Sequence, residues 1–195
     1  MILSDREIKA ALGREAIRIT PRPPDERISS TSVDLTLDVE LRVWRPPPGG
    51  VSLAFSPADA EFNYAAVVAA HSAVVRIPDD GYLFNPREFV LGWTVEKLQL
   101  PHRSRLAARV EGKSSLARLG LGVHVTAPTI HAGFGFKDGD PAFAGNSIQL
   151  EIFHVGPVPI RLKRGMAICQ LILEEVHGTP DKGYSGRFHE QGPQP

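Results

Sequence analysis

The chain has 195 residues, and its 22 lysines and arginines balance 22 aspartates and glutamates, so the formal net charge at pH 7 is zero. This balance argues against the broad basic surface that a nucleic-acid-binding protein needs. The single cysteine, Cys169, excludes a disulfide framework, and no apolar stretch is long enough to span a membrane or serve as a secretion signal. We therefore expect one compact cytoplasmic domain over residues 1–195.

Abundant glycine and proline, with short apolar runs between turn signals, predict many short strands and few helices. The clearest helix begins after Ser4, which forms a capping box with Glu7, and ends near Gly13. Residues 46–50 form a loop, and residues 58–70 are ambiguous between a helix and an irregular insertion. The predicted strands, in chain order, cover residues 32–37, 40–44, 73–77, 89–100, 103–110, 123–127, 147–154, 158–162 and 167–174. This pattern favours a β-rich barrel or sandwich.

The most informative run is residues 111–121, Glu-Gly-Lys-Ser-Ser-Leu-Ala-Arg-Leu-Gly-Leu, which opens a short helical stretch. Unpaired amides at the start of a helix carry partial positive charge, so a lysine and two serines there favour a phosphorylated ligand. Ser114 or Ser115 could equally serve only as a helix cap. The run is not a Walker A motif, because Ala107 stands where that motif requires its first glycine.

This run resembles the phosphate motif of the dCTP deaminase family, a branch of the trimeric dCTP deaminase and dUTPase superfamily. The resemblance continues in order through residues 31–37, 122–127, 149–152 and 165–171, and it includes both ends of the chain. It implies a mainly β fold, the distorted β-barrel of the dUTPase superfamily (β-clip type), with a few short helices. It also implies a homotrimer that holds its ligands where subunits meet.

The resemblance further implies hydrolytic deamination of dCTP to dUTP and ammonia. Most nucleobase deaminases activate the attacking water with zinc, which a histidine or cysteine holds together with a Cys-x-x-Cys pair. A chain with one cysteine cannot supply that pair, so we expect no zinc and a reaction that depends on positioned protons and hydrogen bonds. Magnesium is expected to enter with the triphosphate, not through a protein site of its own.

Glu151 is the candidate proton shuttle. The aliphatic residues Ile148, Leu150 and Ile152 alternate with polar ones, so the Glu151 side chain should point to the face opposite theirs. From the residues alone, an ordinary solvent-facing glutamate is the commoner outcome. By resemblance, Ser114 and the backbone carbonyl near Ala127 would hold the attacking water, and Arg118 would support the charge that develops around the base.

The resemblance also assigns substrate binding to residues in three parts of the chain. In the tail, over residues 180–195, a flexible lid would fold over the phosphates of a neighbouring site; composition alone favours a disordered terminus. The substrate-binding residues are Lys113, Ser114, Ser115 and Arg118 of the phosphate motif, His131 and Gln149 further along, and Tyr184, Arg187 and Gln191 of the lid.

The chain departs from the family pattern at His131, where relatives have an aspartate that contacts the deoxyribose hydroxyl and, in dUTPases, activates the attacking water. Histidine could hydrogen-bond the sugar or act as a base near neutral pH. Two alternatives therefore stay open: a dUTPase-like dNTP pyrophosphatase of the same fold, and a nucleotide-binding regulator without turnover.

A second departure is the loop over residues 135–146, which is longer than the turn typical of the family. It lies between His131 and the predicted catalytic strand, so it could reshape the base pocket. Asp138 and Asp140 lack the further spaced ligands of a calcium loop, and we expect an ordinary loop.

Overall fold

The computed structural model describes residues 1–45, 47, 54–123 and 127–184. Helix α1 (Asp5–Gly13) has the predicted capping box: Ser4 Oγ accepts from the Glu7 amide, and the Glu7 carboxylate accepts from the Ser4 amide at 2.8 Å. Helix α2 (Tyr64–His71) shows that most of the ambiguous segment over residues 58–70 is helical. Helix α3 (Ser114–Ala117) is the short helical stretch of the phosphate motif.

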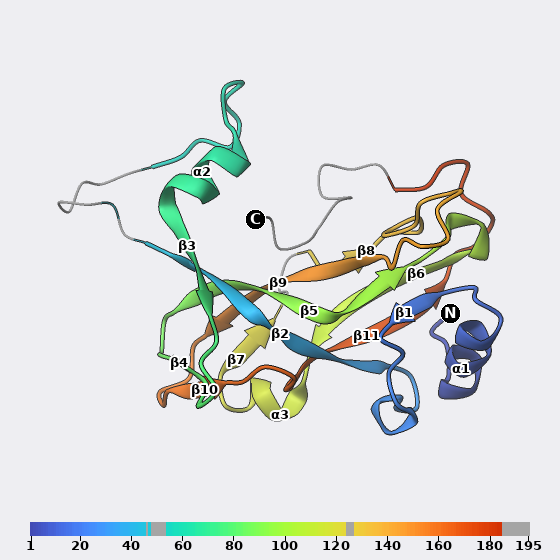
Figure 1. The fold of residues 1–195 in the computed structure, drawn as a ribbon, viewed down its shortest axis with the longest axis horizontal. Helices are drawn as coiled ribbons and strands as arrows, with labels where there is room; N and C mark the ends of the chain where they lie inside the picture. Colours follow the sequence, from blue (N-terminus) through green and yellow to red (C-terminus); the bar gives the residue numbers. More distant parts are fainter. Residues whose placement is uncertain (46, 48–53, 124–126, 185–195) are drawn as a thin grey trace.

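Strands are the main regular secondary structure of the described chain, as predicted. A long sheet has the order β7-β9-β5-β2-β11-β6-β8, with β1 added to β5 and β3 added to β2, and β10 pairs separately with β4. Figure 1 shows this sheet curling, with α1 and α2 towards opposite ends of the molecule. The strands are β1 (Arg18–Thr20), β2 (Val33–Trp44), β3 (Ser72–Arg76), β4 (Tyr82–Phe84), β5 (Phe89–Gln99), β6 (Leu106–Gly112), β7 (Leu121–Val123), β8 (Thr129–Ile130), β9 (Asn146–His154), β10 (Ile160–Leu162) and β11 (Ala167–Glu175).

The strand predictions are wrong in two places. The strands predicted over residues 32–37 and 40–44 are one continuous strand, β2, whose pairing with β5 shifts register between Leu37 and Leu41. The strand predicted from residue 103 begins only at Leu106. Before it, His102–Ser104 form a 3-10 turn, and Arg105 adopts a left-handed conformation with φ 58°.

Other predicted segments fall partly outside the described residues. Of the strand predicted over residues 123–127, residues 124–126 lie outside the described residues. Within the described part, β7 ends at Val123. Of the loop predicted over 46–50, only residue 47 is described. The strands β1, β4 and β8 have two or three residues each, too few to show a hydrophobic period, and they were not predicted.

A buried carboxylate stabilises the middle of the sheet. The Glu96 side chain is 3% exposed and accepts hydrogen bonds from the Thr36 amide and the Thr36 hydroxyl, each at 2.8 Å. Arg27 Nη1 lies 3.3 Å from the same carboxylate. The pairing of β2 with β5 shifts register nearby. In a regular ladder the Thr36 amide would donate to a backbone carbonyl of the neighbouring strand, and here the Glu96 carboxylate is the acceptor instead.

We predict that Glu96→Ala lowers the free energy of unfolding by about 2–4 kcal/mol, because it leaves the Thr36 amide buried without its acceptor. Urea denaturation followed by circular dichroism would measure the change. Glu61→Ala is the control, since Glu61 is exposed and should leave the unfolding midpoint unchanged. Equal midpoints for both variants would show that Glu96 does not stabilise the sheet.

Candidate active site

Glu151 lies on a row of three residues that crosses the sheet. Arg42 of β2 pairs with Leu91 of β5, and Leu91 pairs with Glu151 of β9. Directly paired residues point to the same face of a sheet, so these three side chains share one face. The alternate residues of β9, Leu150 and Ile152, are fully buried in the core on the other face. The predicted direction of the Glu151 side chain is confirmed.

A cavity of about 440 Å³ opens on this face. Five of the predicted site residues, which come from three separate segments of the chain, line it: Ala127, His131, Gln149, Glu151 and Tyr184. The rest of the wall is mostly aromatic or aliphatic and consists of Trp44, Tyr64, Phe89, Leu91, Thr129, Ile130, Phe134 and Ile148. Such a space, with apolar walls and a few polar groups, suits a planar base and its sugar.

The residues predicted to contact phosphate lie elsewhere in this chain. Lys113, Ser114, Ser115 and Arg118 do not line the cavity. The last three lie exposed on or next to α3, which Figure 1 shows on the opposite side of the molecule from α2. The predicted lid residues Arg187 and Gln191 lie outside the described residues.

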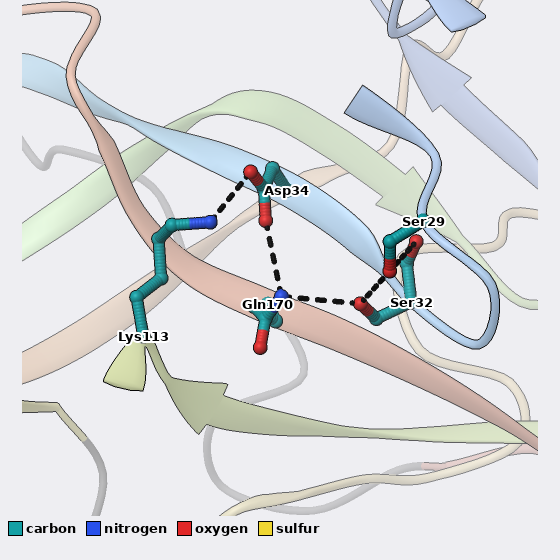
Figure 2. A network of polar contacts seen from close by, with 5 residues as sticks. All are labelled: Ser29, Ser32, Asp34, Lys113 and Gln170. Carbon is teal, nitrogen blue, oxygen red and sulfur yellow. Dashed lines mark hydrogen bonds and ion pairs between the residues drawn. The ribbon is translucent and has the colours of Figure 1, made fainter. Parts of the chain in front are cut away.

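Lys113 joins the phosphate motif to Asp34, in the segment 31–37 that also carries the family resemblance, through a polar network. Its Nζ lies 2.5 Å from Asp34 Oδ2, and both side chains are about one-fifth exposed. Gln170 Nε2 donates to Asp34 Oδ1 and to Ser32 Oγ, both at 3.3 Å. Figure 2 shows the network continuing from Ser32 to Ser29, whose hydroxyls are 2.7 Å apart. The lysine is therefore already held by a carboxylate, and an incoming phosphate would have to share it.

His131 and Tyr184 form one wall of the cavity. Their rings stack with centroids 5.1 Å apart and an angle of 19° between the planes. The Tyr184 amide donates to the Ala132 carbonyl at 3.0 Å, and Gly133, with φ +98°, lets the backbone of residues 183–184 pass directly against it. The resemblance assigned Tyr184 to a neighbouring subunit's site, whereas here Tyr184 lines the cavity of its own chain.

The sequence did not identify the aromatic residues Trp44, Tyr64 and Phe89 as part of the site. Tyr64 is the most informative of them, because burial raises the pKa of its phenol and the negative charge of Glu151 raises it further. Arg42 acts in the opposite direction. An aromatic residue in an alanine-rich segment of ambiguous structure gave no signal that it would line a cavity together with Glu151.

The loop over residues 135–146 is stabilised by its own contacts. Asp140 Oδ1 accepts from the amides of Ala142 and Phe143 at 3.2 and 3.1 Å, and the Lys137 ammonium lies 4.5 Å from the centre of the Phe143 ring. None of its residues lines the cavity, and its role as an ordinary loop stays a prediction. Within the described ranges, no group of three His, Cys, Asp or Glu side chains could hold a metal ion. No helix in the same ranges is long and apolar enough to cross a membrane.

Comparisons with known proteins show which family the chain resembles. Residues 2–176 match the model of a family described as dCTP deaminase-like. The chain is 39% identical to a dCTP deaminase of Marinomonas sp. (strain MWYL1) over 96% of this chain and 90% of that protein. It is 34% identical to a "dCTP deaminase, dUMP-forming" of Methanosphaera stadtmanae over 94% and 83% of the two chains.

The fold also matches a solved structure. A crystal structure of 2'-deoxycytidine 5'-triphosphate deaminase from Agrobacterium tumefaciens superimposes with a TM-score of 0.61 at 21% identity. The match covers 90% of this chain and 48% of that one, so this chain spans about half the length of that protein.

We predict that Gly133→Ala detaches residues 183–184 from the cavity wall, because the new methyl group would overlap the Tyr184 amide nitrogen and Gly183. Trypsin cleavage after Lys182, followed by mass spectrometry, should become several-fold faster. Gly139→Ala is a matched control: its φ of +78° imposes similar backbone strain, but an added methyl group would meet nothing within 4 Å. Equal cleavage rates in the two variants would contradict the prediction.

Proposed function

The chain belongs to the dCTP deaminase-like family, and from this premise we propose that it is a hydrolase that converts dCTP and water to dUTP and ammonia. One observation supports this most: Ala127, His131 and Gln149, which the resemblance assigned to holding the water and the substrate, line one cavity together with Glu151. The apolar walls around them would shelter a cytosine ring from bulk water.

Glu151 would act as the proton shuttle in this reaction. The carboxylate takes a proton from the attacking water as the water oxygen bonds to C4 of cytosine, and it passes that proton to the ring nitrogen N3. The hydroxyl proton of the tetrahedral intermediate then goes, through the same carboxylate, to the amino group, which leaves as ammonia. The backbone carbonyl near Ala127, a residue that lines the cavity, and Ser114 would orient the water, and Arg118 would support the charge on the base.

The phosphates require cations that the cavity does not provide. The described residues that line it include no lysine or arginine, and Glu151 contributes a negative charge. Lys113, Ser114, Ser115 and Arg118 would therefore reach the triphosphate from a neighbouring subunit of a homotrimer, in which the curled sheet forms the distorted barrel of the superfamily. Arg187 and Gln191 would complete the lid. Magnesium would enter as the complex with dCTP, and the site of action would be the cytoplasm.

A second candidate function is deamination coupled to pyrophosphate release, giving dUMP. The relative from Methanosphaera stadtmanae, named dUMP-forming, supports it. His131 replaces the aspartate that would activate water for that second step, so the two candidates differ in what His131 must do. Incubating the protein with dCTP and Mg²⁺ and measuring ammonia and pyrophosphate separates them. Nucleotide binding with neither product would indicate a regulator.

We predict that Glu151→Gln lowers kcat for ammonia release by roughly a hundredfold to ten-thousandfold, because the amide cannot shuttle a proton. Binding of dCTP, measured by calorimetry, should change little. Glu175→Gln, at the exposed end of β11, is the control and should keep native activity. Near-native ammonia release from Glu151→Gln would refute the assignment of the shuttle.

The shared site predicts complementation between inactive variants. Glu151→Gln and Arg118→Ala should each be nearly inactive alone, because one removes the shuttle and the other a cation supplied by the neighbour. When equal amounts of the two variants are refolded together, about a quarter of the sites should be restored. These are the sites in which one subunit supplies a native Glu151 and its neighbour supplies a native Arg118. Two Glu151→Gln preparations mixed in the same way are the control. No recovery in the mixed sample would place both residues in one chain's site.

A further inference from the structure

Helix α2 is fixed above the face of the sheet that carries Glu151. It lies between β2 and β3, which pair with each other, and Asn63 Oδ1 caps its start by accepting from the Ala66 amide at 3.1 Å. At its end, Arg42 Nη1 donates to Ser72 Oγ at 3.3 Å, and Ser72 Oγ donates to the Val68 carbonyl. Arg42 belongs to the row of paired residues that includes Glu151. Its hydrogen bond to Ser72 therefore connects the end of α2 to the strands that carry the candidate site.

The first residue of this helix, Tyr64, lines the cavity together with Glu151. Burial and the Glu151 carboxylate both raise the pKa of the phenol, and the positive charge of Arg42 lowers it. The phenol therefore keeps its proton at neutral pH. A protonated phenol beside a carboxylate can only donate to it, so Tyr64 does not compete with Glu151 as a base.

A proton shuttle needs a carboxylate in one defined orientation. Glutamate has three rotatable side-chain bonds, and a cavity of about 440 Å³ leaves room for several rotamers. A donor on one carboxylate oxygen fixes the side chain and directs the other oxygen at the water and the ring nitrogen. The helix gives such a donor a rigid support.

We propose, on the basis of the function proposed above, that Tyr64 is a positioning residue for deamination: its hydroxyl donates to Glu151 and holds the carboxylate towards the base, and its ring closes that side of the cavity. The two parts of the side chain thus have separable effects. The hydroxyl affects the chemical step, and the ring affects binding of the nucleoside.

The kinetic test uses Tyr64→Phe and Tyr64→Ala, with ammonia release from dCTP as the readout. Tyr64→Phe keeps the ring, so kcat should fall about tenfold with KM within about twofold of native. Tyr64→Ala removes both parts, so kcat should fall and KM should rise. Tyr82→Phe is the matched control, because burial also raises the pKa of that phenol but Tyr82 does not line the cavity. A kcat for Tyr64→Phe within twofold of native would overturn the proposal.

A double-mutant cycle that measures the stability of the protein tests the same contact and does not depend on enzyme activity. Tyr64→Phe, Glu151→Gln and the double variant would be unfolded in urea. We expect the unfolding constants to be non-additive by about threefold or more, since the two side chains interact. Additive effects would refute the assignment of Tyr64 even in an active enzyme. A native protein that releases no ammonia would refute the proposed function, whether or not the cycle shows coupling.

Discussion

The site depends on the side-chain alternation of three neighbouring strands, β2, β5 and β9. Their registers place Arg42, Leu91 and Glu151 on one face and the aliphatic core on the other. The core face is tightly filled, since a methyl group added at Gly92 would come within 3.1 Å of Ile152 and Leu37. A slip of one residue would bury the Glu151 carboxylate among these aliphatics, and an unpaired buried charge is too costly to tolerate. Core packing therefore fixes the direction of the carboxylate.

The residues proposed to bind phosphate present a different electrostatic problem. Lys113 is only about one-fifth exposed, and a lysine at that depth needs a counter-charge when no nucleotide is bound. Asp34 supplies it, and Gln170 holds the other Asp34 oxygen, which restrains the carboxylate when the lysine turns towards a ligand. If Lys113 binds phosphate as proposed, Asp34 would compete for the same ammonium, so the network would stabilise the empty chain and also moderate its affinity for anions. Ser114, Ser115 and Arg118 have no such burial and can meet a ligand directly.

The sequence predicted what depends on short-range pattern. The Ser4 cap of α1, most of the strands and the direction of Glu151 follow from periods of two or from spacings of three residues. The pair Lys113–Asp34 joins residues 79 positions apart, so no local pattern could reveal it. Tyr64 was not predicted because the sequence of helix α2 has no amphipathic period. The position of the helix is set by its Asn63 cap and by the hydrogen bond from Arg42 to Ser72. The family resemblance identified residues for the site, but it could not assign them to one chain or to its neighbour.

The stacked pair of His131 and Tyr184 bears on how this chain differs from relatives with an aspartate at that position. Stacking at 19° uses the faces of both rings, while the imidazole nitrogens lie at the ring edge, so hydrogen bonding to a sugar hydroxyl is compatible with the stack. An aspartate could not stack, and the Tyr184 ring would lose its partner. The histidine therefore does two things that the carboxylate cannot combine: it keeps the tail residue in the cavity wall, and it removes a negative charge from the side of the cavity that a triphosphate must approach. Both effects would favour the proposed binding of a nucleotide, and neither requires His131 to act as a base.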